Sequence, residues 1–180
     1  MKAVHLLPLT LLLANISSAD ELIISYAPSA TIKSDIDESE LKSNSYSRLD
    51  LNPGTANGIR WVPSSELFYV DFTFIDSDND ARGDHDRDYK SLSAGPRFII
   101  EGPINESLKS YFGCTAGVGA TEFGIESGKI RSMAEASFKG GLVFKDTFII
   151  GPEVKFQFIG SPGETVAHVL TFNLNAGIRF

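Results

Sequence analysis

The chain has 180 residues, of which 42% are hydrophobic and 22% are charged, and its formal net charge is −7. This length suits one domain, and the acidic balance without a basic patch argues against nucleic acid as a partner. The single cysteine, Cys114, excludes an internal disulfide and a cysteine-based zinc cluster, and we expect it to act as a small apolar side chain.

Residues 1–19 have the features of a secretory signal peptide. Lys2 gives a positive start, residues 4–16 are mostly apolar, and Ser17-Ser18-Ala19 offers small residues for cleavage before Asp20. We therefore expect a cleaved leader followed by one domain over residues 20–180. No later stretch resembles the ~20 apolar residues of a spanning helix, so crossing a membrane would require strands.

The rest of the chain alternates between apolar and polar residues with a period of two, which predicts strands. In chain order, we expect the eight strands to lie within Glu21–Lys33, Ser47–Val62, Leu67–Ile75, Tyr89–Ile100, Lys109–Ile125, Met133–Lys145, Thr147–Ile159 and Leu170–Phe180. The second is the least regular, because residues 52–58 fit either a loop or a bulged strand. Pro28, Pro96 and Pro152 each remove a ladder donor and predict bulges or irregular edges.

The connections differ in length. Residues 34–46 and 76–88 are long and polar, residues 63–66 and Asp146 are tight, and residues 101–108 are intermediate. An even number of strands, with short turns at one end and longer loops at the other, is typical of outer-membrane barrels. The fold class predicted is therefore all-β, an eight-stranded antiparallel up-and-down transmembrane barrel.

The last strand shows the alternation most clearly. One face carries only apolar residues, namely Leu170, Phe172, Leu174, Ala176, Ile178 and Phe180, and the other face is polar or small. Its length matches a tilted strand that crosses a bilayer. The polar faces are rich in Gly, Ser and Thr with few charges, which suits a narrow interior, so we expect the apolar faces to contact lipid. A soluble exported barrel is the alternative.

The stretch from Leu67 to Phe180 resembles the small eight-stranded outer-membrane barrels of the OmpA/OmpX/Opa-like superfamily. The terminal Phe180, with Phe172, Leu174, Ala176 and Ile178 at alternate positions, is similar to the C-terminal signal read by the barrel-assembly machinery. Gly95-Pro-Arg-Phe98 and Gly151-Pro-Glu-Val154 resemble strand elements common in that group. The resemblance implies a location in the outer membrane of a Gram-negative bacterium.

Charged residues fall on the polar faces of the strands, where they would project into the barrel. They are Arg60, Asp71, Arg97, Glu135, Lys139, Glu153, Lys155 and Arg179. Because unpaired charges are expensive in a tight interior, we expect them to form an ion-paired network that fills it. The alternative is a narrow diffusion channel of the porin type.

Acidic residues gather in the connection at 76–88 and again at 35–40. Asp76, Asp78 and Asp80 are weak candidates for contact with a divalent cation, but the sixth and twelfth positions of this loop hold Ala81 and Arg87, where a calcium-binding EF-hand has Gly and Glu. We therefore expect no dedicated metal site and no cofactor. The loops are expected to contact lipopolysaccharide or an extracellular partner.

Enzymatic activity finds little support in the sequence. Outside the leader only His85 and His168 could act as bases, the first among carboxylates in a loop and the second on an apolar face. The His-x-Ser pairing expected of outer-membrane lipid A deacylases is missing at His168, which is followed by Val169 and Leu170. The sequence therefore predicts a monomeric, non-enzymatic barrel with a structural or surface-interaction role, and a lipid-A-modifying enzyme is a further alternative.

Overall fold

The computed structural model describes residues 20–34, 51–63, 67–76, 89–123, 130–161 and 164–180, and all its regular elements are strands. They are β1 (Glu21–Ser34), β2 (Leu51–Val62), β3 (Phe68–Asp76), β4 (Tyr89–Asn105), β5 (Leu108–Phe123), β6 (Ile130–Phe144), β7 (Phe148–Ser161) and β8 (Glu164–Arg179). The expected leader, residues 1–19, lies outside the described residues. The described part contains no helix of the length and hydropathy needed to span a membrane.

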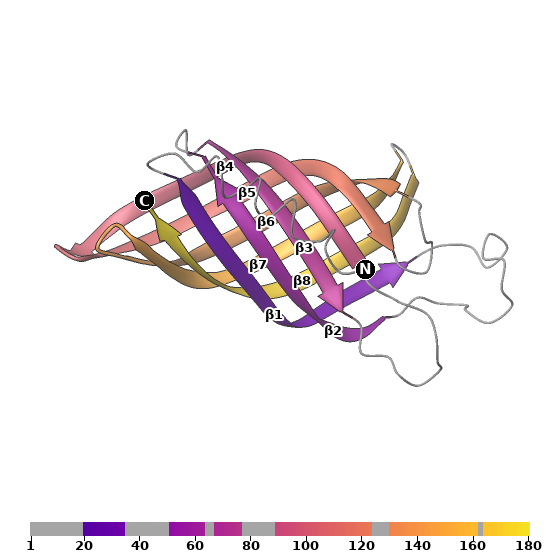
Figure 1. The fold of residues 1–180 in the computed structure, drawn as a ribbon, viewed down its shortest axis with the longest axis horizontal. Helices are drawn as coiled ribbons and strands as arrows, with labels where there is room; N and C mark the ends of the chain where they lie inside the picture. Colours follow the sequence, from indigo (N-terminus) through magenta and orange to yellow (C-terminus); the bar gives the residue numbers. More distant parts are fainter. Residues whose placement is uncertain (1–19, 35–50, 64–66, 77–88, 124–129, 162–163) are drawn as a thin grey trace, which may run out of the picture.

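Each strand pairs antiparallel with the next, and β8 returns to pair with β1, so the sheet closes into a barrel (Figure 1). At the closing seam Glu21 lies opposite Arg179, and Ile24 lies opposite Ala176. Phe180 adds a backbone hydrogen bond, donated to the carbonyl of Asp20 at 3.0 Å. The predicted eight-stranded antiparallel fold is confirmed.

The two faces of the barrel have opposite chemistry. In β8, Phe172 and Leu174 are 57% and 56% exposed, whereas Thr171 and Asn175, which flank this pair, are each 1% exposed and point inward. Large apolar side chains are exposed on the other strands too, including Ile24 in β1, Phe98 in β4 and Phe138 in β6. Because such a belt is costly in water, the exterior matches a hydrocarbon environment.

A bulge at Pro28 changes which face of β1 points inward. The pairing of β1 with both neighbours shifts register before Ala30, at Ala27 towards β2 and at Tyr26 towards β8. Leu22, Ile24 and Tyr26 lie on one face of the strand, and a strict alternation along residues 21–33 predicts that Ala30 lies on the same face. That placement is wrong, since Ala30 is 1% exposed and belongs to the interior. The extra residue of the bulge reverses the alternation beyond it.

Several strand limits differ from the prediction. The fourth strand continues to Asn105, so that only Glu106 and Ser107 connect it to β5. The resulting β4–β5 hairpin projects beyond the C-terminus at the same end of the barrel (Figure 1). At its start β8 is longer than expected, since it begins at Glu164. The uncertain second segment is a strand from Leu51, and its pairing with β1 is bulged.

The prolines of Gly95-Pro96 and Gly151-Pro152 interrupt a ladder without shifting its register. The β4–β5 ladder passes from Ala94↔Val118 to Arg97↔Thr115, and the β6–β7 ladder from Lys139↔Glu153 to Leu142↔Ile150. At these gaps a glycine approaches the neighbouring backbone closely. A Cβ on Gly95 would lie 2.0 Å from the carbonyl oxygen of Ala116, and one on Gly151 would lie 2.0 Å from that of Gly140. At each gap, therefore, a proline that lacks the N–H donor follows a glycine whose missing Cβ lets the two backbones approach.

We predict that Gly95→Ala destabilises the folded barrel by about 1–3 kcal/mol, because the new methyl group meets backbone atoms that cannot turn away. Gly102→Ala is the matched control, since Gly102 also precedes a proline but a Cβ there would have only the Ser110 hydroxyl nearby, at 3.7 Å. Equilibrium unfolding in detergent measures both. Equal midpoints for the two variants would contradict the prediction.

Candidate functional site

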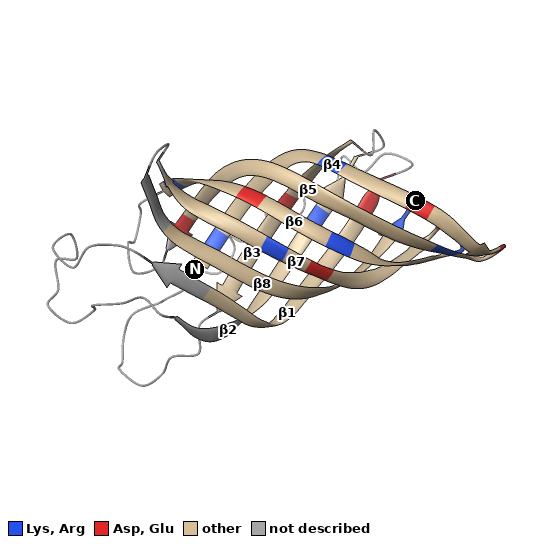
Figure 2. Cartoon of the chain, turned by 180° about the vertical axis from the view of Figure 1, so that it is seen from behind, with Lys and Arg blue, Asp and Glu red and all other residues tan. Residues whose placement is uncertain are grey.

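The interior of the barrel is the candidate site, because charged side chains of both signs gather there. Figure 2 shows that residues of both charges occur at positions along the length of the barrel. Of the eight charges expected inside, seven are at most 3% exposed, namely Arg60, Asp71, Arg97, Glu135, Lys139, Glu153 and Lys155. The eighth, Arg179, lies nearer the end, and its side chain is 18% exposed.

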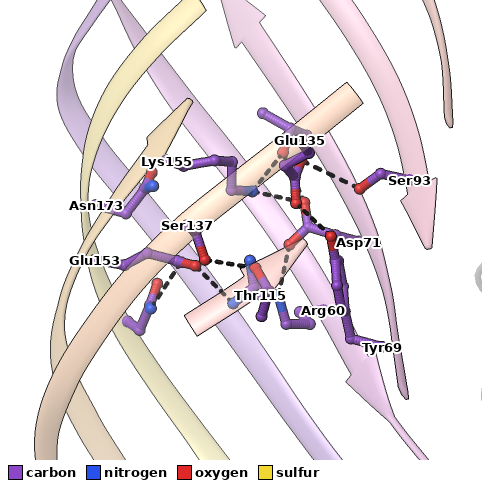
Figure 3. A network of polar contacts seen from close by, with 12 residues as sticks. Arg60, Tyr69, Asp71, Ser93, Thr115, Glu135, Ser137, Glu153, Lys155 and Asn173 are labelled. Carbon is purple, nitrogen blue, oxygen red and sulfur yellow. Dashed lines mark hydrogen bonds and ion pairs between the residues drawn. The ribbon is translucent and has the colours of Figure 1, made fainter. Parts of the chain in front are cut away.

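The centre of this interior is organised around Asp71 of β3 (Figure 3). One carboxylate oxygen accepts a hydrogen bond from Arg60 Nε of β2 at 2.9 Å, and the other accepts one from Lys155 Nζ of β7 at 2.7 Å. Thr73 donates a further bond to the second oxygen at 2.8 Å. Asp71 therefore joins two adjacent strands to a strand on the other side of the barrel.

A second contact crosses the interior from Arg60. Its Nη1 lies 2.8 Å from Glu153 Oε1 of β7, close enough for an ion pair, but the two atoms lack the angles of a hydrogen bond. The other oxygen of Glu153 accepts a bond from Asn175 at 3.0 Å. Arg60 also stacks over the ring of Tyr69, with its guanidinium carbon 5.2 Å from the ring centroid. One guanidinium thus contacts β3 and β7 together.

Glu135 of β6 is held by neutral donors. Its carboxylate accepts hydrogen bonds from Tyr69 Oη at 3.0 Å, Ser93 Oγ at 3.1 Å and Gln157 Nε2 at 2.8 Å (Figure 3). Gln157 in turn accepts a bond from Tyr89 Oη at 2.7 Å. Among the described residues, Glu135 forms no ion pair.

Towards the end with the tight turns, Glu21 of β1 is the central acceptor. Both of its oxygens receive guanidinium bonds from Arg97 of β4, and Arg179 of β8 donates to Oε1 at 2.7 Å. Arg179 also reaches Glu101 of β4 at 2.6 Å. Glu21 and Glu101 were not among the predicted interior charges. The alternation of the strand could have identified Glu21 as an inward-facing residue, because its neighbour Leu22 belongs to the apolar face.

Lys139 of β6 differs from the other interior cations. Its Nζ has no hydrogen-bond or ion-pair partner in the part of the chain that the structure describes. Its neighbour on the adjacent strand is Glu153 of β7. Lys139 is therefore a buried cation beside a carboxylate with which it makes no direct contact.

Apolar side chains lie at both ends of the polar interior. Towards the ends of the strands that lead into residues 35–50 and 77–88, the buried cluster is Ala27, Ala30, Ala56, Ile75, Tyr89, Met133, Ile159, Ala167 and Val169. Towards the tight turns, Tyr111, Val143 and Ile149 pack together with Ile99. The inward faces are thus less uniformly polar than the sequence suggested. At the tight-turn end the charges share a level with the apolar cluster, since Glu101 lies directly opposite Tyr111.

The remaining candidates do not join this network. The residues of the proposed C-terminal assembly signal, Phe172, Leu174, Ala176, Ile178 and Phe180, are all exposed on the outside. His168 is also outside, where its ring packs edge-on against Phe158 at 5.4 Å. The side chains of Asp76, Asp78, Asp80 and His85 lie outside the described residues. Within the described ranges, no group of three His, Cys, Asp or Glu side chains is placed to hold a metal ion.

No protein-family model and no curated protein matches this chain. Solved structures do match. The Neisserial surface protein A structure is 14% identical with a TM-score of 0.57, and covers 91% of this chain and 98% of its own. The outer-membrane enzyme PagL is 16% identical with a TM-score of 0.54, and covers 90% of this chain and all of its own.

These likenesses establish the fold. The chain has the fold of the small eight-stranded outer-membrane β-barrels, which is the fold that the sequence resemblance implied. The expected outer-membrane location agrees with this fold and with the apolar belt on its exterior. Because PagL is an enzyme, the fold by itself leaves the activity open.

We predict that Asp71→Asn destabilises the barrel by about 3–5 kcal/mol, because it leaves Arg60 and Lys155 buried without their shared carboxylate. Asp146→Asn is the control. Asp146 pairs with Lys109 near a turn, where the two side chains are 63% and 39% exposed, and its loss should cost under about 1 kcal/mol. Denaturant unfolding in detergent compares the two, and similar losses would contradict a central role for Asp71.

Proposed function

We propose that this chain is a non-enzymatic outer-membrane barrel whose interior is closed, and which serves as a rigid scaffold for the loops it presents. The observation that carries the proposal is the near-complete burial of the interior charges. Arg60, Asp71, Arg97 and Glu153 are each 2% exposed, so solvent has almost no contact with them. An eight-stranded barrel leaves an interior only just wide enough for side chains, which supports an interior filled by these charged residues.

Two further features support a closed interior. The ion pairs link strands on different sides of the barrel, such as β3 with β7 through Asp71 and Lys155, and β1 with β4 through Glu21 and Arg97. The apolar clusters at both ends disfavour the entry of hydrated ions, because dehydration would have to occur there. A narrow channel would require both the ion pairs to break and the apolar clusters to open.

We predict that the purified chain produces no single-channel steps in planar bilayers under conditions where a known porin conducts. The physical reason is that the charged layer and both apolar clusters obstruct the interior. Regular ohmic steps whose size changes in Arg97→Ala or Glu135→Gln would overturn the proposal and favour the channel alternative. Those residues lie on β4 and β6, so a change at either would place the ion path inside the barrel.

The surface role rests on the acidic connections of the sequence. Residues 76–88 hold six Asp and one His beside two Arg, and they begin at the last residue of β3. The fold is shared with a protein named a surface protein in Neisseria. We infer that these loops contact lipopolysaccharide through divalent cations, or an extracellular partner, and that the barrel is inserted by the barrel-assembly machinery as a monomer.

Deleting residues 78–86 should abolish divalent-cation binding or cell adhesion while leaving the barrel folded, because the deletion removes carboxylates and no described strand. Titration calorimetry with Ca²⁺ and an adhesion assay measure the loss, and the heat-dependent shift in gel mobility confirms folding. A variant with Asn in place of the Asp residues of this segment is the control for charge alone. Full retention of both activities would remove the surface role from this segment.

An enzyme is the second candidate, since the outer-membrane enzyme PagL shares the fold, and the sequence analysis gave lipid A modification as that alternative. Catalysis would need a base oriented toward a nucleophile. His168 faces outward and packs on Phe158, and its strand neighbours on the same face are apolar: Phe172 and the half-buried Leu170. The described residues therefore favour the non-enzymatic proposal.

A further inference from the structure

We infer that Glu153 has two alternative cationic partners, Arg60 across the interior and Lys139 on the adjacent strand, and that exchange between them makes and breaks the contact that joins β2 to β7. The inference goes beyond the scaffold role proposed above. It rests on two buried groups with unused hydrogen-bonding capacity that lie next to each other in the sheet.

The register places these groups as direct cross-strand neighbours. Lys139 of β6 lies opposite Glu153 of β7, and both side chains point inward. Directly opposed residues on one face have Cβ atoms about 4.5–5.5 Å apart, which a lysine side chain spans with ease. Lys139 can therefore reach the carboxylate by a change of rotamer, with no movement of the backbone.

Both atoms needed for the new bond are without a hydrogen-bond partner in the described structure. They are Nζ of Lys139 and Oε1 of Glu153. The second oxygen of Glu153 remains bonded to Asn175 at 3.0 Å and need not move. A buried ammonium without an acceptor is costly, so a rearrangement that supplies one is favoured on the lysine side.

Arg60 can give up Glu153 without losing its own charge partner. Its Nε remains bonded to Asp71 at 2.9 Å, and its contact with Glu153 lacks hydrogen-bond geometry. The exchange therefore replaces a poorly aligned contact across the interior by one between adjacent strands. What is lost is the direct connection between β2 and β7, while Lys155 still joins β7 to Asp71 at 2.7 Å.

The test compares the effect of Lys139→Met in two backgrounds, by equilibrium unfolding of the full chain in detergent micelles. In the wild-type background the substitution should lower the unfolding constant, by about tenfold, because it removes a buried charge that has no partner. In an Arg60→Met background it should raise the unfolding constant by a similar factor, because Lys139 has then become the partner of Glu153. The sign of the effect reverses.

Lys155→Met is the matched control. Lys155 has its own carboxylate, Asp71, so its loss should raise the unfolding constant in both backgrounds. If Arg60→Met does not fold, Arg60→Lys serves in its place, because it keeps a cation beside Asp71 but lacks the second arm that contacts Glu153. An effect of Lys139→Met with the same sign in both backgrounds would overturn the inference. The planar-bilayer measurement tests the closed interior and the unfolding comparison tests the exchange of partners at Glu153. Either proposal can therefore fail while the other holds.

Discussion

The pairing of β1 with β8 is the interaction on which the rest of the structure depends. In hydrocarbon no water can satisfy an open sheet edge, so the barrel has to close. Closure also couples the strands, because every one must then present the same kind of face outward. A slip of one residue in β8 would turn Asn173, Asn175 and Arg179 toward lipid and bring Phe172 and Leu174 inside. The apolar belt and the charged interior are therefore one consequence of closure.

The narrow interior then requires that its charges match. The eight predicted residues include five cations but only three carboxylates, Asp71, Glu135 and Glu153. The structure adds Glu21 and Glu101, which gives five of each. The additional carboxylates meet Arg97 and Arg179, which would otherwise lie together near one end of the barrel. The sequence identified the charged side chains that point inward from the middle of the strands. The balance of positive and negative charge also depends on residues at the strand ends, where the alternation of inward and outward positions is hardest to assign.

The alternation of apolar and polar residues was sufficient to predict the fold, because it continues with a period of two through nearly every strand. It failed where backbone geometry departs from the regular ladder. Ala30 changes face because of the bulge at Pro28, and Gly102-Pro103 resembles a turn although β4 continues through it to Asn105. Pro96 and Pro152 leave the register unchanged because the glycine before each lets the strands stay close. A proline alone cannot distinguish these outcomes, since the neighbouring strand decides them.

Pairing within the interior could not be read from the sequence, because it depends on which strands face each other across the barrel. Lys139 and Lys155 are equivalent by pattern, since both are inward lysines on adjacent strands. Lys155 reaches Asp71, whereas Lys139 has no acceptor among the residues that the structure describes. The carboxylate opposite Lys139 is occupied from the far side by Arg60, whose long side chain crosses an interior that a shorter one could not. The unmatched lysine is thus a product of barrel diameter and side-chain length together.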